Sequence, residues 1–270
     1  MKSLKKIFSS KNSKAGDTTS SSKPAADHPL STPRLTPGVY GSFPSQFSIY
    51  FAGPGQAKKT DHFYLATDED GRVNPLNLFT AHTAMVKLQV ILYAGTDLNS
   101  APLGLAGTEK FFSSTSVIGL PVPAGGEGGN QIERMTDQKK LKFAILNFSV
   151  GVGVGAGQEK GDFEWRSDHL FSTKPREMVE YRLSRLGADG TEGEVVGIWS
   201  KKLEIGEDCK MGTFRFQGSG ATGELGEYWT LMAVMSVIRL CQVDWVAKGA
   251  AEGFFKAGGK LAGAGLGFAV

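Results

Sequence analysis

The stretch Trp229–Ile238 constrains this chain more than any other, because it carries no charge and almost no polar group. It contains helix formers such as Leu231 and Met235, and neither Gly nor Pro interrupts it. A helix that is apolar on every side is buried on every side. The run is shorter than the about 20 apolar residues that a bilayer requires, and Arg239 ends it. We therefore expect a core helix over residues 223–243, enclosed by the chain that precedes it.

Short runs of β-type residues dominate the chain between this helix and residue 46. They lie at 46–51, 62–66, 77–81, 86–93, 116–120, 141–154, 162–166, 178–186, 194–203 and 213–217. In the last run, Phe214 and Phe216 alternate with Arg215 and Gln217, a period that is typical of half-buried strands. The dipeptides Asp70-Gly71 and Asp189-Gly190 indicate tight hairpin turns between strands.

These runs predict a mainly β fold with one buried helix. No convincing helical period precedes residue 223, so a doubly wound parallel sheet is excluded. We expect a closed antiparallel β-barrel of about twelve strands around a central hydrophobic C-terminal α-helix, because a barrel that wide has room for a helix. Closure also removes exposed strand edges. The alternative is a sandwich with the helix against one face, which would require a helix with a polar side.

Strands followed by one apolar helix give the chain a resemblance to a known superfamily. The blocks GDFEWRSDHLF, EYRLSRL, GEVVGIWSKK and GTFRFQGSGATGELGEYWTLMAVMSVIRL resemble the Tubby C-terminal-like superfamily, which includes Tubby-like, LURP-one-related and scramblase-like proteins. The blocks are most similar to uncharacterised fungal members, and the resemblance covers residues 46–245. It rests on block order and the strand-then-helix ending rather than on a catalytic motif.

The resemblance implies a twelve-stranded barrel around a helix and no catalytic centre. Tubby-like proteins bind phosphoinositides through a basic surface patch, which cannot be transferred here residue by residue. Scramblase-like members bind calcium through an acidic motif, and this sequence shows no clear match to it. The sequence also departs from the family pattern by continuing well past the helix, through residues 246–270.

Two tails flank the predicted barrel domain of residues 46–245. Residues 1–45 are rich in Ser, Thr, Pro and basic residues, so we expect a disordered tail. Residues 246–270 form a Gly/Ala-rich tail, either disordered, packed on the barrel, or helical at a membrane surface. The residues that we expect to contact anionic lipid are Lys2, Lys5, Lys6, Lys248, Lys256 and Lys260.

Two glycine-rich segments look like nucleotide-binding loops, and we interpret both as structural. Residues 218–223 read GSGATG, but too little chain follows for a dinucleotide-binding sheet, and acidic residues at 224 and 227 would repel phosphate. We expect a turn into the barrel there. Residues 151–157 read GVGVGAG and lack the ending of a phosphate-binding loop. Glycine at alternate strand positions favours close approach of another backbone segment.

Composition and side-chain spacing give no cofactor or metal site. His28, His62, His82 and His169 have no metal-ligand spacing, and the acidic residues 68–70 suit a solvated hairpin tip. The four tryptophans are expected in the core. Cys209 and Cys241 are expected as reduced thiols, with a disulfide as the alternative.

We therefore expect a non-catalytic binding or adaptor module, peripheral to anionic, phosphoinositide-containing membranes. The alternative is a protein-interaction or signalling module with no lipid role, and the least favoured is an enzyme that uses the GSGATG turn. No secretory signal or transmembrane segment is predicted, which favours a cytoplasmic protein at a membrane surface and leaves the nucleus open. A net charge of +3 is too small to indicate nucleic acid as a partner.

Overall fold

The computed structural model describes residues 33–54, 60–82, 89–109, 113–126, 129–140, 143–153, 159–167, 178–202 and 209–262. In the C-terminal helix, side chains are described as far as residue 246. The predicted lipid contacts at Lys2, Lys5 and Lys6, together with His28 and His169, lie outside these residues.

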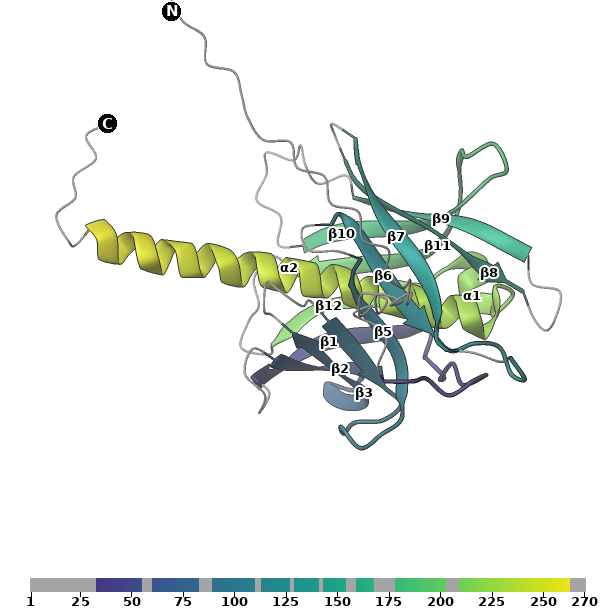
Figure 1. Ribbon diagram of the computed structural model, residues 1–270, viewed down its shortest axis with the longest axis horizontal. Helices are drawn as coiled ribbons and strands as arrows, with labels where there is room; N and C mark the ends of the chain where they lie inside the picture. The colour runs from purple at the N-terminus through teal and green to yellow at the C-terminus, as the bar shows by residue number, and fades with distance from the viewer. Residues whose placement is uncertain are drawn as a thin grey trace, which may run out of the picture.

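Twelve strands and two helices make up the fold (Figure 1). The first six strands are β1 (Gln46–Pro54), β2 (Thr60–Glu69), β3 (Arg72–His82), β4 (Gln89–Tyr93), β5 (Pro102–Thr108) and β6 (Thr115–Leu120). The next six are β7 (Gln131–Lys140), β8 (Phe143–Val152), β9 (Glu159–Ser167), β10 (Met178–Leu186), β11 (Glu192–Lys202) and β12 (Lys210–Phe216). They are followed by α1 (Gly218–Thr222) and α2 (Gly226–Ala262).

The strands form a closed antiparallel barrel, which confirms the predicted fold class. Each strand pairs with its neighbours along the chain, and β1 returns to β12 to complete the circle. The closing register joins Gln46 to Arg215 and Phe47 to Phe214. At the β2–β3 hairpin, Asp70 and Gly71 both have positive φ, of 50° and 73°, as the predicted tight turn requires.

The helix α2 runs through the middle of the barrel, as predicted, and its central residues are buried on all sides. Trp229 and every residue from 231 to 242 are buried. The stretch Gly226–Val246 is long and apolar enough to cross a membrane. The shorter uncharged run 229–238 excludes a bilayer by its length, and that argument does not hold for the longer stretch. However, 72% of that stretch is buried inside the protein, which is the burial expected of a core helix.

Arg239 does not end the apolar helix, which corrects the sequence-based interpretation. Its side chain is only 2% exposed. Its Nε donates to the hydroxyl of Ser116 at 3.0 Å, and its Nη1 donates to the side-chain oxygen of Gln242. Gln242 in turn donates to the backbone oxygen of His82 at 3.1 Å. The guanidinium is therefore held inside the barrel by neutral groups, and burial lowers its pKa to about 10.

Large aromatic side chains fill the space between helix and wall, as expected for the tryptophans. Trp165, Trp199 and Trp229 are fully buried. Trp245 is partly buried, and its ring lies 4.6 Å from that of Phe51. The two cysteines are not joined in a disulfide; Cys209 is half-buried and Cys241 is buried.

The packed part of the chain begins before residue 46, where the sequence analysis places the start of the barrel. Leu35 is buried in an outer cluster with Leu105 and Val117. Tyr40 packs its ring edge against Tyr228 at a centroid distance of 5.7 Å. Residues 33–45 are therefore held by apolar contacts that their Pro- and Ser-rich composition does not indicate.

At its other end, α2 continues as a helix past the predicted domain boundary at residue 245 to Ala262. Figure 1 shows this extension leaving one end of the barrel.

Candidate functional site

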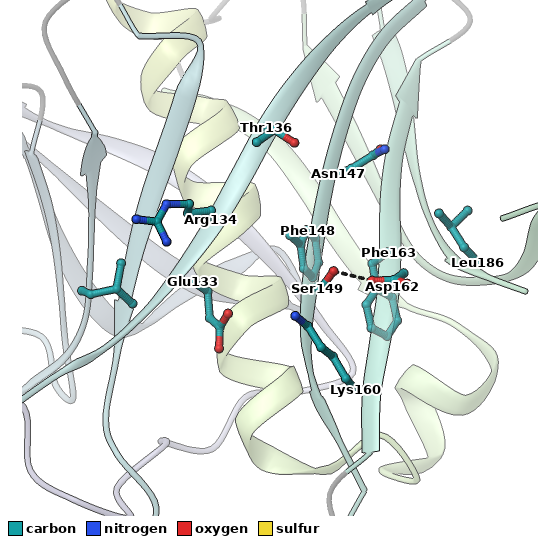
Figure 2. A pocket seen from close by; sticks show the side chains of 11 residues that line it. Glu133, Arg134, Thr136, Asn147, Phe148, Ser149, Lys160, Asp162, Phe163 and Leu186 are labelled. Carbon is teal, nitrogen blue, oxygen red and sulfur yellow. Dashed lines mark hydrogen bonds between the residues drawn. The ribbon is translucent and has the colours of Figure 1, made fainter. Parts of the chain in front are cut away.

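The neighbouring strands β7 and β8 separate over part of their length. They are paired from Lys140↔Phe143 as far as Met135↔Phe148. Beyond that point, residues 131–134 of β7 and 149–152 of β8 do not pair with each other. Residues 131–134 still pair with β6, and residues 149–152 still pair with β9. We call these two facing segments the β7–β8 split. In Figure 2 the two ribbons diverge, and α2 is visible behind them.

A cleft of about 520 Å³ lies at the split. A volume of this size is typical of a small-ligand site. The cleft is lined by Ile132, Glu133, Arg134, Thr136, Asn147, Phe148, Ser149, Lys160, Asp162, Phe163 and Leu186 (Figure 2). Because side chains on a strand alternate between the two faces, the lining combines an apolar inner part with a polar outer part.

The inner part of the cleft contacts the core helix through packing and a hydrogen bond. Phe148 and Phe163 are buried and stack with centroids 5.4 Å apart. Beside them, the Tyr228 hydroxyl on α2 donates to Glu133 Oε1 at 3.2 Å. Gln131 Nε2 donates to the same oxygen at 2.8 Å. Burial, reinforced by the Glu133 carboxylate, raises the pKa of Tyr228 well above its ordinary value, so this hydroxyl remains a donor.

The outer rim of the cleft carries both signs of charge, and one of its cations, Arg134, forms an ion pair. Arg134 Nε lies 2.9 Å from Glu109 Oε1, and the Ser149 hydroxyl donates to Asp162. Lys160 is exposed and forms no ion pair with any residue that the structure describes. The rim therefore presents both a cation, Lys160, and an anion, Asp162, because the neutral Ser149 hydroxyl does not cancel the charge of the carboxylate.

One buried polar atom in the cleft lining also lacks a partner. The side-chain oxygen of Asn147 is inaccessible to solvent and has no hydrogen bond. Buried polar atoms are rarely left unpaired in folded proteins. Because solvent does not reach this oxygen, a ligand in the cleft could bond to it only after the lining side chains had moved.

The cleft is equipped for binding. It offers hydrogen-bonding groups, an exposed ammonium group and an apolar floor, and none of its lining residues is a histidine or a cysteine. In the part of the chain with described side chains, no group of three His, Cys, Asp or Glu residues could hold a metal ion.

The GSGATG segment forms α1 and the turn into α2, as the structural interpretation predicts. Gly218 and Gly223 both have positive φ, which favours glycine. The backbone N–H and the hydroxyl of Ser219 donate to the Glu194 carboxylate at 2.7 and 2.6 Å. These hydrogen bonds lower the pKa of Glu194. The carboxylate thus occupies the amide that a phosphate would need.

In the GVGVGAG segment, residues 151 and 152 pair with β9, and Gly153 meets the turn before α2. The Gly153 N–H donates to the Leu225 oxygen at 3.0 Å. A Cβ added to Gly226 would lie 2.2 Å from the Gly153 oxygen. A backbone segment does approach Gly153, but a Cβ on Gly153 itself would meet nothing within 4 Å, so the contact requires glycine at 226 rather than at 153. Residues 154–158 lie outside the described residues.

The cleft and the predicted lipid contacts are separate parts of the chain. Lys248, Lys256 and Lys260 fall on the extension of α2, and Lys256 and Lys260 are one helical turn apart. The cleft was not predicted from the sequence, because β7 was not recognised as a strand. The sequence of β7, QIERMTDQKK, is mostly polar. The alternation of Glu133 and Met135 with Arg134 is the signal that could have indicated it.

Comparisons of this chain with protein-family models, curated proteins and solved structures gave no match. The resemblance to the Tubby C-terminal-like superfamily stays a prediction.

Proposed function

We propose that this protein is a non-catalytic binding module and that the cleft at the β7–β8 split is its ligand site. The observation that carries the proposal is the coincidence of an interrupted strand ladder with a cleft of about 520 Å³. A closed barrel normally pairs every strand along its length, so an unpaired segment at a cleft is a site where a ligand can supply the missing contacts.

Binding accounts for the cleft better than catalysis does. An acid–base site needs a group within reach of the reacting atom and free to exchange a proton. Here Glu133 accepts hydrogen bonds from two side chains, and Asp162 accepts one from Ser149. The barrel interior, where a substrate would otherwise fit, is filled by α2.

A pair of serine substitutions tests this proposal. Ser149 and Ser200 lie on the outer face of β8 and β11, and each donates to a carboxylate on a neighbouring strand. Tyrosine suits strands, so S149Y should fill the cleft without unfolding the barrel, and S200Y is the matched control. The probes are the common amino acids and simple dipeptides, screened by ligand-observed NMR against the full chain.

We expect hits that bind the parent and S200Y and lose binding in S149Y. Thermal unfolding of both variants shows whether each is folded, and K160E provides a second cleft variant if S149Y is not. Hits that bind S149Y as well as the parent, or the absence of any hit, would overturn the cleft as a ligand site.

A second function, attachment to an anionic membrane surface in the cytoplasm, is favoured by the extension of α2. This helix continues beyond the barrel and carries Lys248, Lys256 and Lys260. Each lysine near an anionic surface contributes about 1 kcal/mol. Co-sedimentation with vesicles should therefore require acidic phospholipid and should weaken in a variant with all three lysines changed to glutamate. Equal recovery with neutral vesicles would remove this function.

A further inference from the structure

We infer that the cleft is regulated by the chain itself: the lysine-rich segment 2–23 binds in cis at the β7–β8 split and competes there with the ligand. This inference rests on the proposed function and adds a means of regulation to the same site. Three features carry it, namely the place at which the chain after this segment is attached to the barrel, the charge around the cleft, and the unpaired strand edges of the split.

The chain that follows the segment is fastened next to the split. The side chain of Asn130 donates to the Pro33 carbonyl oxygen at 3.1 Å and accepts a hydrogen bond of 2.9 Å from the Leu35 N–H. Asn130 directly precedes β7, and therefore the unpaired edge 131–134. Leu35 is buried in the outer cluster, against which Ile132 of the cleft lining packs. The residues that precede Pro33 are thus attached to the barrel beside the cleft.

The connection is long enough for the segment to reach the split and short enough to favour binding. Lys23 and Pro33 are about ten positions apart. An extended chain covers up to about 36 Å over this distance in sequence. The unpaired edge 131–134 is only about 13 Å long, at about 3.3 Å per residue. A short tether of this kind holds its cargo at an effective concentration of roughly millimolar, so a weak intrinsic affinity is sufficient.

The cleft lining contains more carboxylates than cations that lack an ion pair. Glu133 and Asp162 come from β7 and β9, on the two sides of the split (Figure 2). Both accept hydrogen bonds from neutral groups and form no ion pair with any described residue. Of the two lining cations, Arg134 is paired with Glu109, which lies outside the lining, and Lys160 has no ion pair among the described residues. An added ammonium group is therefore attracted to the cleft.

The end of the barrel at which the split lies adds to this negative charge. It is the end where α2 enters, since Leu225 and Tyr228 contact Gly153 and Glu133. The segments at this end are 33–45, 69–72, 94–101, 121–130, 153–160, 185–194 and 217–227. The cations described in them are Arg34, Arg72, Lys160 and Arg185. The more numerous carboxylates described in them are Glu69, Asp70, Asp97, Glu159, Asp189, Glu192, Glu194, Glu224 and Glu227.

The segment 2–23 has the composition that complements this end of the barrel. Its charged residues are one aspartate, Asp17, and the lysines Lys2, Lys5, Lys6, Lys11, Lys14 and Lys23. Opposite charges attract across an interface and select the partner that binds. The edges 131–134 and 149–152 are each paired on one side only, so they can also pair with the main chain of an extended segment whatever its sequence.

The test compares the full-length parent with two full-length variants that lose positive charge. In the first, which we call the segment variant, the six lysines of residues 2–23 are changed to glutamine. In the matched control, Lys248, Lys256 and Lys260 on the α2 extension are changed to glutamine. Hydrogen exchange of residues 131–134 and 149–152 is measured in all three proteins at several protein concentrations.

A second measurement uses a synthetic peptide of residues 2–23. It is titrated by fluorescence anisotropy against the parent, the segment variant, and the segment variant that also carries S149Y or S200Y. A peptide with its lysines replaced by glutamine is the control ligand. The segment variant with D162N, which loses a rim carboxylate, provides a second cleft variant if S149Y does not fold.

We expect amide exchange at the two edges to be about tenfold faster in the segment variant than in the parent and the matched control. The peptide should bind the segment variant about tenfold more tightly than the parent, because the parent's own segment competes for the split. Its binding should fall by about tenfold with S149Y, should weaken with D162N, and should be unchanged with S200Y. The glutamine peptide should not bind.

Equal exchange in the parent and the segment variant, or no binding of the peptide to the segment variant, would overturn the inference. The proposed function survives that result if small ligands still bind the parent and S200Y but not S149Y, so the two failures are distinguishable. Protection of the two edges that increases with protein concentration would identify the segment of a second copy as the occupant and would overturn binding in cis.

Discussion

The indole nitrogen of Trp165 on the barrel wall donates a hydrogen bond of 2.9 Å to the hydroxyl of Ser236 on the core helix. The Ser236 hydroxyl in turn donates a hydrogen bond of 2.7 Å to the backbone oxygen of Ala233. Both side chains are fully buried. In a mainly apolar interior, this bond helps to fix the rotation and depth of α2 relative to β9, as the Arg239–Ser116 bond does relative to β6, because apolar contacts have no comparable directionality.

Replacing Ser236 with alanine should destabilise the protein by about 1–3 kcal/mol, because the buried Trp165 N–H loses its only described acceptor. Chemical denaturation measures the loss. The control is Thr230→Ala, since the Thr230 hydroxyl bonds only to the Gly226 oxygen of its own helix. Similar losses of stability in both variants would show that the Trp165–Ser236 bond stabilises the fold no more than a hydroxyl bonded within its own helix does.

Replacing Gly226 with alanine should be far more damaging than replacing Gly223. Both glycines have positive φ, of 83° and 81°, so both substitutions cost about 1 kcal/mol or more in backbone strain. A Cβ on Gly226 would also collide with the Gly153 oxygen at 2.2 Å, whereas a Cβ on Gly223 meets nothing within 4 Å. Melting temperatures of G226A and G223A test this order, and equal shifts would contradict it.

Replacing Arg239 with methionine should leave stability at neutral pH unchanged or raise it by about 1–2 kcal/mol. The guanidinium is buried among neutral partners, so removing its desolvation cost offsets the loss of its hydrogen bonds to Ser116 and Gln242. Urea unfolding of parent and R239M measures the difference. A loss above about 2 kcal/mol in R239M would contradict the prediction.

The same pair has a pH signature. Burial lowers the pKa of Arg239 from 12.5 to about 10, so the folded state binds fewer protons than the unfolded state above pH 10. The stability of the parent relative to R239M should therefore rise as the pH increases from about 10 toward 12. A difference that stays flat in this range would show that Arg239 titrates normally.

Tyr181 should produce the opposite trend. Burial, with a smaller contribution from Asp244, raises the pKa of Tyr181 from 10.0 to about 12. The unfolded state then loses its phenolic proton first, so the parent loses stability between pH 10 and 12. The substitution Tyr181→Phe removes this loss, which pH-dependent unfolding of parent and Y181F detects. Parallel curves for the two proteins would contradict the prediction.

The sequence was sufficient to predict the barrel and its core helix, because both follow from local patterns. An apolar run that lacks a polar side excludes a helix on the surface, and Asp-Gly pairs mark hairpins. The twelve strands pair in chain order, so no long-range connection had to be inferred except the return of β1 to β12.

Two strands, β5 and β7, were missed for different physical reasons. The sequence PLGLAGT of β5 has small residues where the wall lies against the helix, and a Cβ on Gly104 would lie 2.7 Å from Met235 Sδ. The sequence of β7 is polar because one face is exposed and the other holds Glu133 under Tyr228. Strand propensity reflects packing context, which neither sequence reveals.

The cleft could not be predicted, because it depends on the point at which two strands separate. Nothing in the residues before Met135 or after Phe148 forbids continued pairing. The separation instead coincides with the approach of Leu225 to Gly153 and of Tyr228 to Glu133, both contacts between residues far apart in the chain.

The order of elements also governs how the molecule can be made. The closing pair Gln46↔Arg215 joins the first strand to the last, and the helix that fills the interior comes after both. A nascent chain leaving the ribosome therefore carries eleven strands before β12 is available to pair with β1 and before α2 is available to fill the barrel. Such long-range closure is slow and leaves apolar strand faces uncovered meanwhile. Biosynthesis of this protein should accordingly depend on chaperones until the final quarter of the chain has emerged.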